Sequence, residues 1–84
     1  MAKLPVISGR EAVQVFVTLG WAVARQRGSH IVLVKEGESA SLSVPDHEQV
    51  AKGTLRSLIR LAGITVDEFL DALSQGGASD AQKF

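Results

Sequence analysis

The 84-residue chain contains no cysteine, and this absence excludes several classes of site. A disulfide framework, a zinc knuckle and a thiol nucleophile all require cysteine. Long hydrophobic runs are also missing, since no apolar stretch approaches the ~20 residues that span a bilayer. Lys3 is followed by only a few apolar residues, so we expect no signal peptide. These absences lead us to expect one small, soluble, cytoplasmic domain with no membrane contact.

Histidine is scarce as well, because His30 and His47 are the only two in the chain. The carboxylates beside His47, at Asp46 and Glu48, lack the i, i+4 helical spacing of zinc motifs. No glycine-rich segment has the form of a phosphate-binding loop. We therefore expect no metal site and no cofactor.

The chain has no net formal charge, but its charged residues are unevenly distributed. Residues 1–66 carry eight Lys and Arg against five Asp and Glu, whereas residues 67–84 carry four acids against one base. Asymmetry of this kind is a hint that the basic part meets a polyanion. An ordinary solvated surface gives the same pattern, so the charge distribution alone does not establish a polyanion partner.

Helix-capping residues and apolar periodicity predict three helices, at residues 9–19, 54–62 and 66–73. The first and the third begin with capping boxes, formed by Ser8 with Glu11 and by Thr65 with Glu68. Thr54 is expected to cap the second helix. Between the first two helices, three apolar or alternating segments predict an antiparallel meander, at residues 21–27, 31–34 and 41–44.

The residues therefore predict an α+β fold, in which a helix is followed by a three-stranded antiparallel meander, a second helix and a short extra C-terminal helix. We expect the domain to occupy residues 1–73. Residues 74–84 are mostly small and polar without periodicity, and we expect a flexible C-terminal tail there.

The segment from residue 25 to residue 35 carries the most chemical information. Arg25 and Arg27 precede a Gly28–Ser29 turn, and His30 then opens an unbroken apolar run that fits a strand. An imidazole held by strand backbone beside fixed positive charge suits phosphodiester chemistry, because it can exchange a proton near neutral pH. The alternative, in which His30 is a structural residue at the end of a strand, remains open.

Residues 55–73 have the proportions of a helix-turn-helix, but DNA binding is disfavoured. The second of these helices carries Asp67, Glu68 and Asp71 and no base, so phosphate would repel it. Arg56 and Arg60, which are i and i+4 on the preceding helix, are better placed to face an anion.

Four blocks, in this order and spacing, resemble the HicA toxin family, the small mRNA interferases of bacterial toxin–antitoxin pairs. They are Ser-Gly-Arg-Glu at 8–11, Arg-Gly-Ser-His at 27–30, Val-Pro-Asp-His at 44–47, and Lys-Gly-Thr-Leu-Arg through Ala-Gly-Ile at 52–64. The resemblance covers residues 4–73. It implies a double-stranded-RNA-binding-like fold with the helices on one face of the sheet, endoribonuclease activity on mRNA, and silencing by a HicB-like antitoxin.

The resemblance places the family's catalytic histidine at His30 and its Pro-x-His motif at Pro45 and His47. Around His30 as general base, Ser29, His47 and Lys52 are candidate supporting groups. The candidate RNA contacts are Arg25, Arg27, Lys52, Arg56 and Arg60.

RNA cleavage needs no metal here, because RNA brings its own 2′-OH nucleophile and requires only a base and a cation at the phosphate. Two alternatives remain. The chain could be a non-catalytic RNA-binding module of the same fold, in which His30 is structural. It could also be a pure interaction protein that persists only in complex with its antitoxin.

Overall fold

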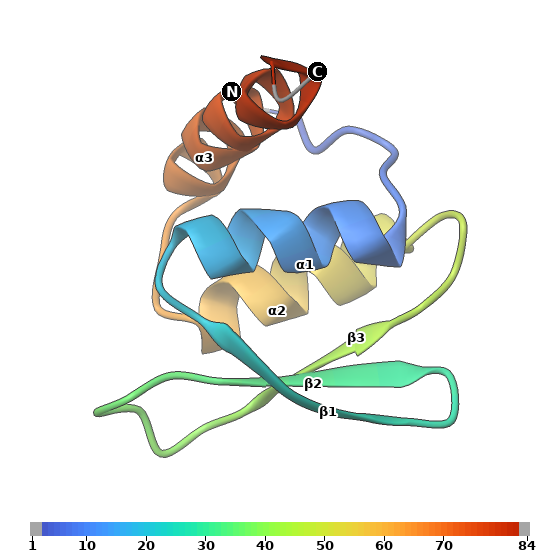
Figure 1. Cartoon of the computed structure of the whole chain (residues 1–84), viewed down its shortest axis with the longest axis vertical. Coiled ribbons are helices and arrows are strands. Elements are labelled where there is room, and N and C mark those ends of the chain that lie inside the picture. Colours follow the sequence, from blue (N-terminus) through green and yellow to red (C-terminus); the bar gives the residue numbers. More distant parts are fainter. Residues whose placement is uncertain (1–2, 83–84) are drawn as a thin grey trace.

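Helices and strands follow one another in the predicted order in the computed structural model, which describes residues 3–82 and the side chains of residues 3–75 (Figure 1). The elements are α1 (Gly9–Thr18), β1 (Ala22–Arg27), β2 (His30–Val34), β3 (Leu42–Pro45), α2 (Lys52–Leu61) and α3 (Val66–Gln82). The strands form one antiparallel sheet in the order β1-β2-β3. Helices α1 and α2 cover one face of this sheet, and α3 packs beyond them against α1. The predicted α+β fold is confirmed.

Two capping boxes start α1 and α3, as the sequence predicts. The Ser8 hydroxyl accepts the Glu11 N–H at 3.1 Å, and the Glu11 carboxylate accepts the Ser8 N–H at 2.9 Å. Thr65 and Glu68 repeat this exchange at 3.0 and 2.8 Å. Each box satisfies two backbone donors that a helix N-terminus would otherwise leave unpaired.

The predicted boundaries of α2 are wrong by one or two residues, and the predicted end of α3 is wrong by nine. Helix α2 begins at Lys52 after Ala51, which provides no side-chain cap, so Thr54 lies inside the helix. The chain is already fixed at Val50, whose side chain is buried and whose N–H donates to the Ile7 carbonyl at 2.9 Å. Because Val50 is fixed in this way, the helix begins at Lys52, two residues before the start at Thr54 that the sequence predicts.

Helix α3 continues to Gln82 rather than ending at residue 73. No proline interrupts residues 74–82, so nothing in the backbone forces the helix to stop. That residues 74–84 form a flexible tail stays a prediction, and residues 83–84 lie outside the described part of the chain. None of the helices within residues 3–82 has the length and apolarity that a membrane crossing demands.

A β-bulge in β1 changes which of its side chains share a face. Val23 pairs with Leu33 and Arg25 pairs with Val32, which leaves Ala24 as the extra residue. Neighbouring residues of β2 point to opposite faces, and directly paired residues share a face. Regular alternation along residues 21–27 would place Val23 and Arg25 on the same side. The bulge instead places Val23 toward the helices and Arg25 away from them.

The core lies between the sheet and the helices. Phe16 of α1 and Phe69 of α3 are fully buried, with ring centroids 5.4 Å apart and planes tilted by 56°. Leu33 and Leu42 from the sheet and Leu55 from α2 complete its centre. Because Phe69 is buried against α1, the start of α3 belongs to the folded domain.

Candidate active site

The central strand β2 presents alternate side chains to two different environments. Ile31 and Leu33 belong to the hydrophobic core beneath the helices. His30, Val32 and Val34 therefore project from the opposite face of the sheet. Figure 1 shows no element over that face within residues 3–82. His30 thus opens the central strand on the open face of the sheet, and it is exposed.

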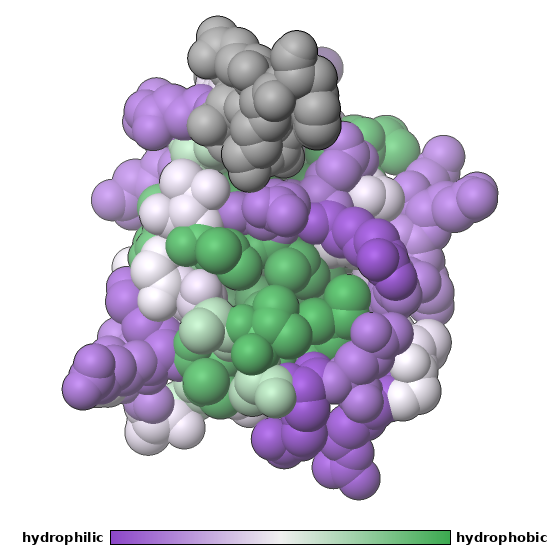
Figure 2. Space-filling view, viewed as in Figure 1, coloured by the Kyte–Doolittle hydropathy of each residue, from purple (hydrophilic) through white to green (hydrophobic). Residues whose placement is uncertain are grey.

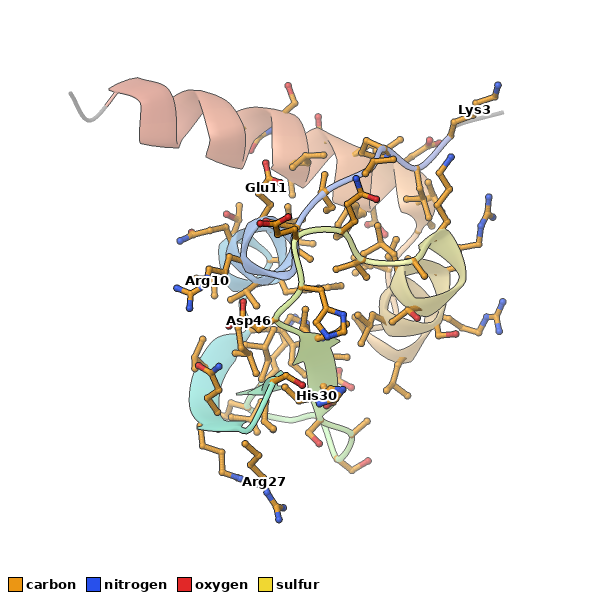
Figure 3. All side chains as sticks on the ribbon, turned by 90° about the vertical axis from the view of Figure 1, so that its right-hand side faces the viewer. Lys3, Arg10, Glu11, Arg27, His30 and Asp46 are labelled. Carbon is orange, nitrogen blue, oxygen red and sulfur yellow. The ribbon has the colours of Figure 1, made fainter. Side chains whose placement is uncertain are left out.

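Two arginines of β1 share this open face with His30. Arg27 is the direct cross-strand partner of His30, and Arg25 pairs with Val32. Figure 3 shows Arg27 extending from the sheet on the side away from the helices. We call Arg25, Arg27 and His30 the open-face cluster. It brings a titratable imidazole to the same surface as two guanidinium groups.

The tight turn before His30 is held from outside by the chain that follows β3. Gly28 adopts a φ of +58°, which a side chain would disfavour. The Ser29 carbonyl accepts the Asp46 N–H at 2.7 Å, and Pro45 is the second cross-strand partner of His30. The backbone on both sides of His30 is therefore fixed.

Asp46 connects this turn to α1 and β1. Its carboxylate accepts from Arg10 Nε at 3.2 Å and Nη2 at 3.3 Å, and from Gln26 Nε2 at 3.2 Å (Figure 3). The hydrogen bond from Arg10 holds the pKa of Asp46 below its ordinary value, with Gln26 and His47 acting in the same direction and desolvation opposing them. Gln26 Nε2 also donates to the Gly28 carbonyl at 3.3 Å. Asp46 therefore holds the turn that presents His30.

Sequence reasoning missed this role of Asp46, which it considered only as a neighbour of His47 in a metal motif. No local spacing could indicate it, because Arg10 lies 36 residues away. Within the described residues, no group of three or more His, Asp or Glu could hold a metal ion.

The loop after β3 is also fixed by the start of α1. The Gly9 N–H donates to the His47 carbonyl at 2.8 Å. The His47 side chain is exposed and makes no hydrogen bond to another described residue. The backbone of His47 is therefore fixed next to Pro45 and the His30 turn, while its imidazole is exposed.

The remaining predicted cations lie on α2. Lys52 is at the start of this helix, and Arg56 and Arg60 line a hollow of about 220 Å³ together with Ile59 and Ile64. Helix α2 lies on the helix-covered side of the sheet (Figure 1). Of the predicted RNA contacts, Arg25 and Arg27 therefore come from β1 and the other three from α2.

The Arg10–Asp46 ion pair makes stability depend on pH in a defined direction. Because the folded-state pKa of Asp46 is lowered, its charged carboxylate stabilises the fold fully above the unfolded-state pKa, which is near ~4. This stabilisation is lost as pH falls through the folded-state pKa. We expect the wild-type chain to be more stable than Asp46→Asn at pH 6, and this difference to shrink as pH falls through the lowered pKa of Asp46.

Urea unfolding at several pH values measures this difference. Glu48→Gln is the matched control, since it removes an exposed carboxylate that makes no hydrogen bond within the described part. A pH-dependent difference of the same size in both variants would contradict the assignment to Asp46.

Comparisons with known proteins agree with one another over most of the described chain. A family model described as the HicA toxin of bacterial toxin–antitoxin systems matches residues 9–64. A solved toxin–antitoxin complex from Streptococcus pneumoniae contains a chain with 30% identity and a TM-score of 0.62. The match covers 69% of this chain and 98% of that one. No curated protein gives a significant match.

Proposed function

The chain belongs to the HicA toxin family of bacterial toxin–antitoxin systems, and on that basis we propose that it is a metal-independent endoribonuclease that cleaves mRNA. The observation that carries this proposal is the position of His30, exposed on the open face of the sheet directly beside Arg27. A rigid backbone holds both residues, and the open face leaves room for a nucleic-acid strand.

In the proposed reaction, His30 removes the proton from a ribose 2′-OH. The 2′-oxygen then forms a bond to the adjacent phosphorus, and the bond from phosphorus to the 5′-oxygen breaks. The products are a 2′,3′-cyclic phosphate and a 5′-OH, whose proton comes from His47 or from water. Arg27 stabilises the negative charge that develops on the phosphoryl oxygens. Ser29 acts through its backbone, which holds the turn before His30.

The cations divide into contacts close to the reaction and contacts farther along the RNA. Arg25 and Arg27 share the face of His30 and bind the phosphates next to the cleaved bond. Arg56 and Arg60 lie farther along α2 and would contact another part of a longer RNA, whereas Lys52, at the first residue of this helix, remains a candidate supporting group for the reaction. Because these contacts are electrostatic, RNA binding should weaken as salt increases.

The partner that neutralises the toxin is proposed to be a HicB-like antitoxin. Family membership supports an antitoxin partner, and so does the similarity to a chain from a toxin–antitoxin complex. The place of action is proposed to be the cytoplasm, where mRNA is available.

The nucleophile provides the most direct test of the proposal. We expect the purified chain to cleave a long mRNA in EDTA, and to leave both DNA and 2′-O-methyl RNA of the same sequence uncut. The reason is that both substitutes lack the 2′-OH that attacks phosphorus. Product ends are identified by mass spectrometry, where a 2′,3′-cyclic phosphate is expected.

Cleavage of single-stranded DNA at a comparable rate would rule out this mechanism. Binding of RNA in a gel-shift assay without any cleavage would instead support the alternative of a non-catalytic RNA-binding module.

A further inference from the structure

Strand β1 is an edge strand, and the backbone groups on its side away from β2 have no partner strand within residues 3–82. All six of its residues are exposed, and within residues 3–82 its backbone hydrogen-bonds to β2 alone. An edge strand of this kind is a template onto which another strand can add.

An apolar groove lies beside this edge, between β1 and α1. Its volume is about 380 Å³, and its apolar residues are Val13, Val23 and Ile31. Val23 is 53% exposed, which is unusual for a valine that faces the helices rather than the open side of the sheet. Figure 2 shows apolar surface continuing between α1 and β1 on this side of the molecule.

The charged residues beside β1 restrict which kind of partner can bind at this edge. Arg25 and Arg27 stand on the open face of β1, and Arg10, which is already paired with Asp46, lines the groove together with Glu11. A second copy of this chain, paired through β1, would bring the arginines of both copies together, and like charges on neighbouring strands repel. RNA would match the arginines but would leave the apolar groove empty.

We propose that the edge of β1 is the docking site of the antitoxin, which adds one β-strand there with alternating apolar and acidic side chains. The apolar side chains fill the groove over Val23, and the acidic ones stand beside Arg25 and Arg27. Alternation follows from strand geometry, since successive side chains point to opposite faces.

Docking at this edge also explains how the antitoxin inhibits the proposed reaction. Carboxylates beside Arg25 and Arg27 occupy the cations that the RNA phosphates require. The inference rests on the proposed antitoxin partner, but it does not require the chain to cleave RNA.

The test uses a purified HicB-like antitoxin, the proposed partner of this chain. Val23→Asp places a charge in the apolar groove, and Leu61→Asp is the matched control. Leu61 is 51% exposed on α2, which contributes no residue to the groove. We expect Val23→Asp to bind the antitoxin about 30-fold more weakly or worse, while cleaving RNA at the wild-type rate. Leu61→Asp should bind the antitoxin as tightly as the wild type does.

Amide hydrogen exchange on the wild-type complex tests strand addition without any substitution. We expect the amides of residues 22–27 that point away from β2 to exchange at least about tenfold more slowly in the complex. Unchanged exchange there, or wild-type affinity of Val23→Asp, would overturn the docking site. A wild-type chain that binds the antitoxin but does not cleave RNA would overturn only the proposed nuclease activity.

Discussion

Replacing His30 with alanine is expected to leave the chain folded and to lower the rate of RNA cleavage by at least about 10²–10⁴-fold. The fold should survive because His30 is exposed on the open face and makes no side-chain hydrogen bond within the described part of the chain. The rate should fall because the variant has no base to take the 2′-OH proton. Single-turnover cleavage of a defined RNA measures the rate, and circular dichroism checks the fold.

The matched control is His47→Ala, which removes the only other histidine. We expect a milder loss of rate, because the His47 side chain is exposed in a loop and water can replace it as the acid. If His30→Ala cleaves normally while His47→Ala is inactive, the two roles have been assigned in the wrong order. If both variants remain active, the histidine mechanism itself is wrong.

Local signals were sufficient to predict most of the architecture from the sequence. A capping box involves residues only three apart, so Ser8 and Glu11 could be identified without knowledge of the fold. The strands were recognised from partial or clean alternation at residues 21–27 and 41–44, and from an unbroken apolar run at residues 31–34. The order of the elements then restricted the topology to a meander, which the structure confirms.

Features that depend on distant contacts could not be predicted. The bond from Asp46 to Arg10 joins segments 36 residues apart, and neither residue is unusual in its own segment. The bulge at Ala24 reverses the face of Arg25 relative to Val23, yet the strand pattern is regular through that point. The open-face cluster therefore follows from the register of β1 on β2 rather than from the spacing of its residues.

Replacing Gly9 with alanine should lower stability more than the same change at any other glycine within residues 3–75. A Cβ at this position would overlap the Pro45 carbonyl oxygen and lie 2.9 Å from the carbonyl carbon and 3.1 Å from the Asp46 Cα. All three are backbone atoms, so no flexible side chain can move aside. The start of α1 must shift, which also breaks the hydrogen bond from the Gly9 N–H to the His47 carbonyl.

We expect Gly9→Ala to lower the free energy of unfolding by about 2–4 kcal/mol, from overpacking together with one lost hydrogen bond. That is most of the ~3–5 kcal/mol that a core of this size supplies.

Gly53→Ala is the matched control, because Gly53 also lies in the first turn of a helix but has open space where the Cβ would be. Alanine has a higher helix propensity than glycine, so the melting temperature of the Gly53→Ala variant should rise slightly. Thermal unfolding of the two variants should therefore shift in opposite directions. Equal stability of both variants would mean that α1 does not pack against Pro45 as closely as described, and the support of the His30 turn by this loop would then be in question.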